Sequence, residues 1–227
     1  MKTKIKKFVS IVLVFAIVMM AAIGTTTQNV EAATKKITSS NSTLSLSWTS
    51  KTYGSSGYNS IPTTTVKYKT VTGYKTLTKG TDYTVTSKWT SGSGGTSSTY
   101  YGYVGKHTVT ISGKGSYSGS LSKTYYIYPK TVSGIKKSSS ESGAVLYVQW
   151  THQNGVTKYQ VQYKSNKESS WTTTTVGTGK YTNTTSSVSI NKSSHKGTYY
   201  YVRVRAYSPY TSSWSSSVKI TPKYAVT

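Results

Sequence analysis

The sequence predicts an all-β fold of two β-sandwiches in tandem, and three observations support this prediction. Thr, Ser, Tyr and Val dominate the composition while Leu and Ala are scarce, and β-branched and aromatic residues favour strands. Apolar and polar residues alternate with a period of two in several segments, which Gly, Asn, Ser and Pro separate. After residue 32, no segment repeats apolar residues at helical spacing over three turns.

The first 32 residues have the pattern of a secretory signal peptide. Four lysines among the first seven residues precede an apolar run from Phe8 to Ile23, and Val30-Glu31-Ala32 fits a cleavage site. The run is shorter than the ~20 residues that a spanning helix needs, and an uncleaved N-terminal anchor is the alternative. No second apolar run follows. We therefore expect a secreted, extracellular, cell-wall-associated protein that has no membrane span after cleavage.

Residues 33–227 suffice for two domains of about 95 residues each, and one large sandwich is the alternative. The alternating pattern restarts after Pro129 to Ser133, which predicts domains at 33–130 and 131–227. Cys is absent, so each core must be held by packing without disulfides.

Alternating segments account for most of the first predicted domain. A polar Ser/Gly-rich stretch from Ser91 to Ser98 reads as a surface loop. The residues expected to face the interior of successive strands are Leu44, Leu46 and Trp48; Val66 and Tyr68; Tyr83 and Val85; Val109 and Ile111; and Leu121, Tyr125 and Ile127.

The second predicted domain alternates more regularly, and its segments follow each other at the spacing of a seven-stranded sandwich. Its longest alternating strand contains Tyr200 and continues to Ala206, and Val218 and Ile220 close the domain. Over both domains, the residues that we expect in the core are Trp48, Trp150, Tyr159, Val161, Tyr200, Val202 and Val204.

Residues 131–223 resemble a fibronectin type III domain. The resemblance rests on Trp150, on Lys158–Tyr163, on the Tyr-x-Val-Arg-Val-x-Ala pattern within Gly197–Tyr207, and on Trp214-Ser215-Ser216. It implies an immunoglobulin-like sandwich in which Trp150 fills the space between the sheets. It also places Tyr200 at a tyrosine corner, where the hydroxyl bonds to the preceding backbone.

Residues 34–130 resemble the immunoglobulin-like repeats found in surface proteins of Gram-positive bacteria. Leu77–Val85 and His107–Gly119 carry this resemblance. The loop between them is longer and richer in Ser and Gly than in typical members, and it ends in three tyrosines, Tyr100, Tyr101 and Tyr103. This departure leaves open a binding role for the loop. Both resemblances imply spacers, adhesive modules or accessory domains of secreted enzymes.

Charge is the most unusual feature of the composition. Residues 33–227 carry 24 Lys or Arg and only three acids, Asp82, Glu141 and Glu168. The excess is shared equally, with 12 basic residues in each predicted domain. Such a basic protein attracts polyanions over a long range, and salt weakens the attraction.

The residue types offer no catalytic machinery. Asp82 lies in a turn, where Asp commonly accepts backbone N–H bonds, and the other two acids lie in Ser-rich loops. His107, His152 and His195 are isolated from each other, and we expect His152 and His195 to be solvated at strand ends or turns. We expect no enzyme activity, catalytic residue, metal, cofactor or small-molecule substrate.

Four residues of the longest strand form the candidate binding face. Tyr199, Tyr201, Arg203 and Arg205 alternate with interior residues and should point outward. Arg binds planar anions with two parallel hydrogen bonds, and aromatic faces stack on sugars or bases. The alternative is that these residues only form cross-strand pairs on an exposed sheet.

These observations favour a secreted, non-catalytic spacer or adhesion module of the cell surface that associates with anionic cell-wall polymers. A dedicated binding protein for acidic glycans or another polyanion is the second hypothesis, and an accessory protein of a secreted enzyme is the third. We expect nucleic acid to bind only as a non-specific polyanion.

Overall fold

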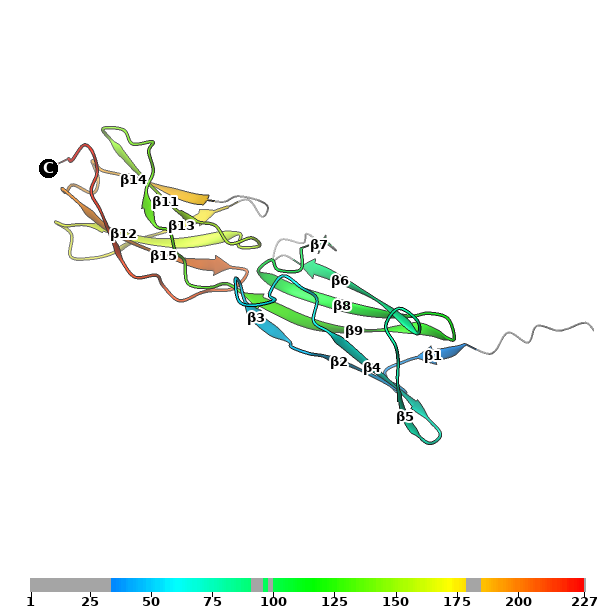
Figure 1. Cartoon of the computed structure of the whole chain (residues 1–227). Coiled ribbons are helices and arrows are strands. Elements are labelled where there is room, and N and C mark those ends of the chain that lie inside the picture. The colour runs from blue at the N-terminus through cyan, green and yellow to red at the C-terminus, as the bar shows by residue number, and fades with distance from the viewer. Residues whose placement is uncertain (1–33, 91–95, 98–99, 179–184, 227) are drawn as a thin grey trace, which may run out of the picture. The chain divides into compact units, whose positions relative to one another are not determined.

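The structure, a computed structural model, describes residues 34–90, 96–97, 100–178 and 185–226. Every regular element in these ranges is a β-strand, and the strands form two β-sandwiches in tandem (Figure 1). The predicted signal peptide, residues 1–32, lies outside the described residues, as does most of the predicted Ser91–Ser98 loop. Within the described ranges, no helix has the length and hydropathy needed to cross a membrane.

The first sandwich pairs a large sheet with a small one. The strands of the large sheet, in spatial order, are β1 (Lys35–Ile37), β9 (Tyr117–Tyr128), β8 (Gly105–Gly113), β6 (Tyr83–Thr90) and β7 (Thr96–Ser97), and β3 (Ser50–Thr52) also pairs with β9. The small sheet contains β2 (Ser42–Leu46), β4 (Thr64–Thr70) and β5 (Gly73–Thr76).

The alternation of the sequence places one face of β6 and one face of β8 in the interior. In β8, His107, Val109 and Ile111 are buried and the residues between them are more exposed. One cluster of buried side chains draws on both sheets and contains Ile37, Val66, Leu77, Tyr83, Ile111 and Tyr117. Burial of such side chains contributes roughly 1.5–3 kcal/mol each, which is how a chain without Cys holds this fold together.

Trp48 departs from its expected position on a strand. Strand β2 ends at Leu46, and Trp48 follows it as a half-buried residue at the edge of the core. Its ring meets Tyr125 edge-on with the ring centroids 4.9 Å apart, and the ammonium group of Lys51 lies 4.9 Å from the Trp48 ring centroid. A large aromatic ring that is partly buried and partly exposed to solvent suits the end of a strand better than the middle of a core.

Gly119 permits the parallel pairing of β1 with β9. Its φ is +80°, and a Cβ atom there would lie 2.4 Å from the carbonyl oxygen of Ile37, with which Gly119 is paired. Any side chain would therefore push β1 away from the sheet, and only glycine adopts this backbone angle without strain.

The second sandwich contains a three-stranded and a four-stranded sheet. The first consists of β10 (Lys136–Lys137), β11 (Val145–Thr151) and β14 (Thr185–Asn191). The second has the order β13 (Thr172–Gly177), β12 (Lys158–Ser165), β15 (Tyr200–Ser208) and β16 (Val218–Ile220). Figure 1 shows β12 and β15 side by side, and they pair over eight residues of β12 with one irregularity between Lys158 and Tyr159.

The core of the second sandwich contains the residues that the alternation selects. Trp150, Tyr159, Val161, Tyr200, Val202 and Val204 are all completely buried. The Trp150 ring meets the Tyr159 ring edge-on at 5.4 Å. The Tyr200 hydroxyl donates a hydrogen bond to the carbonyl of His195, which confirms the expected tyrosine corner.

Residues of the turn between β11 and β12 form hydrogen bonds with two residues of the first sandwich. Lys130 follows β9, and Val104 precedes β8. The Gln153 side chain accepts a 2.9 Å hydrogen bond from the Lys130 backbone N–H and donates a 2.8 Å bond to the Lys130 carbonyl. The Val104 N–H donates to the carbonyl of Asn154 at 2.8 Å. The predicted domain boundary at Pro129 to Ser133 stays a prediction, although the four sheets of the described chain each take their strands from one side of it.

A buried ion pair fastens the C-terminal segment to the second sandwich. Lys192 is completely buried, and its ammonium group donates to Glu141 at 2.8 Å and to the Tyr224 carbonyl at 2.7 Å. Glu141 also accepts hydrogen bonds from the backbone N–H groups of Lys223 and Tyr224. Burial by itself raises the pKa of Glu141, but the bonds from Lys192, from these two N–H groups and from Lys137 outweigh it and lower the pKa to about 2.

Glu141→Gln should destabilise the protein by about 3 kcal/mol at pH 7, because it leaves the buried Lys192 ammonium without a carboxylate. The ordinary pKa of this carboxyl is 4.5 and its folded pKa is about 2. Ionised Glu141 therefore stabilises the fold fully above pH 4.5, and this contribution disappears as the pH falls towards 2. Urea unfolding at pH 7 and pH 3 measures both effects. Between these two pH values, the free energy of unfolding should fall less for the variant than for the unchanged protein.

Glu168→Gln is the matched control. Glu168 is 30% exposed and pairs with His195, so its removal should cost only about 1 kcal/mol. Equal losses for the two variants would contradict the role given to the buried pair.

Candidate functional site

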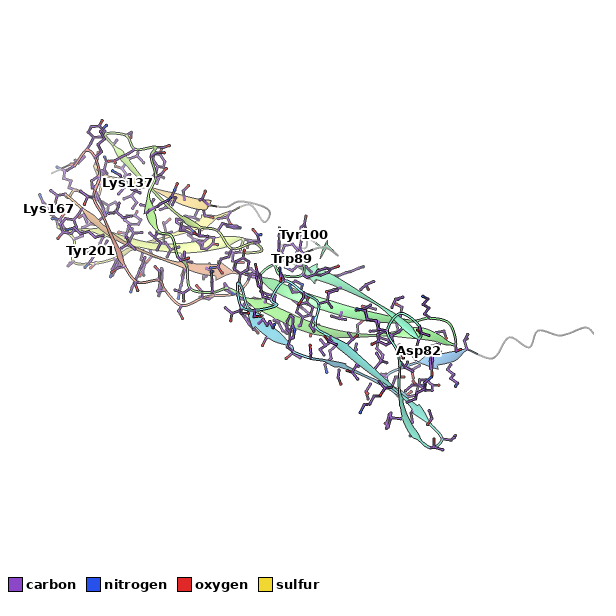
Figure 2. All side chains as sticks on the ribbon, in the orientation of Figure 1. Asp82, Trp89, Tyr100, Lys137, Lys167 and Tyr201 are labelled. Atoms are coloured by element: carbon purple, nitrogen blue, oxygen red, sulfur yellow. The ribbon has the colours of Figure 1, made fainter. Side chains whose placement is uncertain are left out.

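The four predicted binding residues lie on the outward face of the four-stranded sheet. Tyr201, Arg203 and Arg205 belong to β15, and Tyr199 directly precedes it; all four are half-buried. They alternate with the buried Tyr200, Val202 and Val204, and Figure 2 labels Tyr201 on this strand. The pleat of β15 therefore presents them on one surface, which we call the β15 face.

Arg203 lies close to two indole rings. Its guanidinium carbon lies 4.7 Å from the ring centroid of Trp171 and 5.1 Å from that of Trp214. Its Nε donates a 2.8 Å hydrogen bond to the side-chain carbonyl of Gln162, its partner on β12. Cation–π contacts such as these two contribute about 0.5–2 kcal/mol each to stability.

Arg205 repeats the arrangement one pleat further along. Its guanidinium carbon lies 4.6 Å from the Trp214 ring centroid. Its Nε and Nη2 both donate to the side-chain carbonyl of Gln160, at 2.8 and 2.6 Å. Trp214 therefore covers both arginines of the chain, and the two guanidinium groups are fixed in place rather than free to reorient.

Two serines determine the position of Trp214. The segment from Ser212 to Ser215 runs beside β15, where the hydroxyl of Ser212 accepts from the Ala206 N–H and that of Ser215 accepts from the Val204 N–H, both at 3.0 Å. These bonds satisfy backbone N–H groups that would otherwise be buried without a partner. They hold the intervening Trp214 against the arginines.

The other end of the β15 face carries tyrosines and lysines. Tyr199 and Tyr201 meet edge-on at 5.5 Å. The Lys219 ammonium lies 3.9 Å from the Tyr199 ring centroid, and the Lys164 ammonium lies 5.4 Å from that of Trp171. Positive groups are thus interleaved with aromatic rings along the whole face.

The contacts of Arg203 determine which of its groups can still bind a ligand. The Arg203 guanidinium already has two indoles in cation–π contact, so a sugar or base would have to compete with them to stack on it. Of the five N–H donors of its guanidinium, only Nε–H has an acceptor among the described residues. The Nη edge remains, and such an edge binds carboxylate or phosphate oxygens in a bidentate manner.

Several residues that contact the arginines of the β15 face were not predicted from the sequence as part of the binding site. Gln160 and Gln162 were detectable, since they alternate with the core residues of β12. Trp171 precedes β13 and Trp214 lies between strands, so strand alternation does not assign either to a face. Only the sheet order, which places β12 beside β15, brings these side chains together.

The histidines differ from the sequence-based expectation. His152 is buried rather than solvated, and its Nδ1 lies 3.0 Å from the Ser186 hydroxyl; burial lowers its pKa. His107 is also buried, with its ring stacked on Tyr125 at 4.5 Å, and burial outweighs the bond to the Tyr103 carbonyl and lowers its pKa to about 4.

His195 is not isolated, because the fold brings it to Glu168, with Nδ1 2.7 Å from the carboxylate. Burial alone raises the pKa of Glu168, but bonds from the Ser165 N–H and from His195 outweigh it and lower the pKa. A paired His and carboxylate can orient a general base, yet a nucleophile must also lie within hydrogen-bond reach. The nearby Ser165 hydroxyl is buried and forms no hydrogen bond with the described residues.

The third acid behaves as expected. The Asp82 carboxylate accepts a 2.9 Å hydrogen bond from the Thr78 N–H, which confirms its turn role. In the described ranges, no three side chains of His, Cys, Asp or Glu gather as metal ligands do.

No family model matches the chain, and no curated protein matches it. A two-domain fibronectin type III segment of chicken tenascin is 15% identical, with a TM-score of 0.44 over 80% of this chain and 99% of that one. The FN1–FN3 domains of chicken CNTN1 are 12% identical, with a TM-score of 0.32 over 84% and 69%. The alpha chain of the chicken interferon gamma receptor is 11% identical, with a TM-score of 0.36 over 70% and 91%. The structural neighbours of this chain thus include fibronectin type III domains, while its two-sandwich fold follows independently from the strand pairing and burial described above.

Arg203→Lys should lower the free energy of unfolding by about 1–2 kcal/mol, because Lys keeps the charge but loses the planar contact with two indoles. Chemical denaturation followed by tryptophan fluorescence measures this loss. Lys167→Gln, at an exposed residue, is the control and should change stability by less than about 0.5 kcal/mol. A loss for Arg203→Lys as small as that of the control would show that the stacked arrangement contributes nothing.

Proposed function

We propose that this protein is a secreted, non-catalytic module of the cell surface, a spacer or an adhesion module, that associates through charge with anionic polymers of the envelope. The observation that carries the proposal is an excess of positive charge that the fold leaves almost entirely without carboxylate partners. The following two features of the described residues support it.

The three acids are already occupied within the fold. Glu141 pairs with Lys137 and Lys192, Glu168 pairs with His195, and Asp82 bonds to a backbone N–H. In the described ranges, only two lysines therefore have a carboxylate within salt-bridge distance.

The remaining lysines are available to a large partner. Except for Lys51, Lys164 and Lys192, every lysine of the described ranges is exposed. They occur on both sandwiches, which matches an extended polymer better than a compact ligand. Association of this kind is long-range and is screened within about 10 Å at 0.1 M salt.

A dedicated site for an acidic glycan on the β15 face is the second candidate. The unoccupied Nη edge of Arg203 favours it, because that edge is fixed in place by Trp171, Trp214 and Gln162. A preorganised donor pair loses less conformational freedom on binding than a flexible lysine does.

Retention of the full secreted chain on immobilised polyphosphate and polyglutamate, eluted with increasing NaCl, tests the proposal. We expect strong retention at 0.05 M NaCl and complete elution by about 0.5 M, where exposed charges are screened. Retention that resists 0.5 M NaCl, or no retention at low salt, would argue against charge-driven association.

Two charge-removing variants separate the two candidates. Lys67→Gln changes an exposed residue of β4, and Arg203→Gln changes the β15 face. Charge-driven association predicts that both lower the eluting salt concentration by the same small amount. A loss at least tenfold larger for Arg203→Gln, confined to one polyanion, would instead identify a dedicated site.

A further inference from the structure

A second surface, away from the β15 face, has different chemistry. A hollow of about 250 Å³ lies among the loop that follows β3, the segment that precedes β8 and the turn between β11 and β12. Five tyrosines and two asparagines line it together with Gly102, namely Tyr53, Tyr58, Tyr100, Tyr101, Tyr103, Asn59 and Asn154. We call it the tyrosine hollow.

One wall of the tyrosine hollow is a fixed aromatic stack. The rings of Tyr100 and Tyr103 are stacked 4.4 Å apart with an interplanar angle of 21°. The buried Trp89 meets both rings edge-on, at 5.9 and 5.3 Å, and Figure 2 shows Trp89 next to Tyr100. The indole N–H of Trp89 is itself bonded to the Val104 carbonyl at 3.1 Å, so the stack rests on a rigid base.

The opposite wall is also aromatic and lies close to the first. Tyr53 and Tyr58 are 5.1 Å apart, and burial followed by their mutual contact raises the pKa of Tyr58. A Cβ atom on Gly102 would lie 2.8 Å from Asn59 Cα and 3.0 Å from the Tyr58 ring. Glycine at position 102 therefore lets the two walls approach each other.

The polar groups of the tyrosine hollow are neutral. Among the described residues, the side-chain amides of Asn59 and Asn154 have no hydrogen-bond partner, and each amide offers donors and an acceptor. No charged side chain lines the hollow, although the chain has a net charge of +24. The nearby Lys51 instead donates to the Ser56 carbonyl and contacts Trp48.

We propose that the tyrosine hollow is a binding site for an uncharged carbohydrate. A pyranose ring has an apolar C–H face and a rim of hydroxyl groups. Tyrosine rings can cover the C–H face, and amide and phenol groups can exchange hydrogen bonds with the hydroxyls. A purely apolar ligand would leave the amides of Asn59 and Asn154 without partners, which costs binding free energy, and no charged side chain lines the hollow to pair with an anion.

This site is independent of the polyanion association proposed above. Binding in the tyrosine hollow involves no ionic contact, so salt should not weaken it. Association with anionic polymers, in contrast, should disappear at high salt. The two activities can therefore be measured separately on the same protein.

Isothermal titration calorimetry of the full secreted chain in 1 M NaCl tests the site with three probes: cellotetraose, maltotetraose and tetra-N-acetylchitotetraose. We expect at least one probe to bind, and Tyr58→Ala and Asn59→Ala to weaken that binding at least tenfold. Tyr58→Phe, which removes only the hydroxyl group, keeps the proposal testable if Tyr58→Ala does not fold.

Tyr74→Ala is the matched control, because Tyr74 is 62% exposed on β5 and does not line the hollow. It should bind the probe as the unchanged protein does. The proposal is overturned if none of the three probes binds in 1 M NaCl, or if Tyr74→Ala weakens binding as much as the hollow variants do. Retention of Tyr58→Phe and Asn59→Ala on polyphosphate at low salt should stay unchanged, so failure of one proposal leaves the other measurable.

Discussion

Side chains on a β-strand point alternately to its two faces, and the rest of the second sandwich depends on how β15 uses this alternation. Tyr200, Val202 and Val204 fill the space between the sheets, and the intervening Arg203 and Arg205 point outward to meet Trp214. The same strand therefore holds the core together and builds the surface that we consider for binding. A shift of one residue in its register would expose the apolar side chains and bury the arginines, so the core fixes the surface.

The second constraint is the scarcity of negative charge. With three acids after residue 32, each carboxylate has a structural use, and the clearest is that of Glu141. It makes a completely buried Lys192 tolerable and at the same time binds the backbone of the C-terminal segment. Among the exposed lysines of the described residues, only Lys137 has a carboxylate within salt-bridge distance, so the field of the others is directed outward.

Tyrosine serves three different purposes in this chain, and its amphipathic ring explains why. Tyr200 fills the core and bonds through its hydroxyl to the backbone. Tyr199 faces outward beneath a lysine, and Tyr53 and Tyr58 line a neutral hollow. A ring with an apolar body and a polar end suits interior, interface and surface alike, which is why composition alone does not assign a tyrosine to one of them.

The amino-acid sequence was sufficient to predict the all-β fold, the strands of the second sandwich and most of its core, because period-two alternation is a local property that survives folding. It also determined the excess of charge and the outward direction of Tyr201, Arg203 and Arg205. The contacts of these residues depend on the three-dimensional fold, because Trp171 and Trp214 come from irregular segments. In the same way, His195 meets a carboxylate 27 residues away. The burial of His152 and Lys192 and the tyrosine hollow likewise depend on contacts between segments distant in sequence. Such contacts follow from sheet order and loop path, and neither is encoded in local spacing.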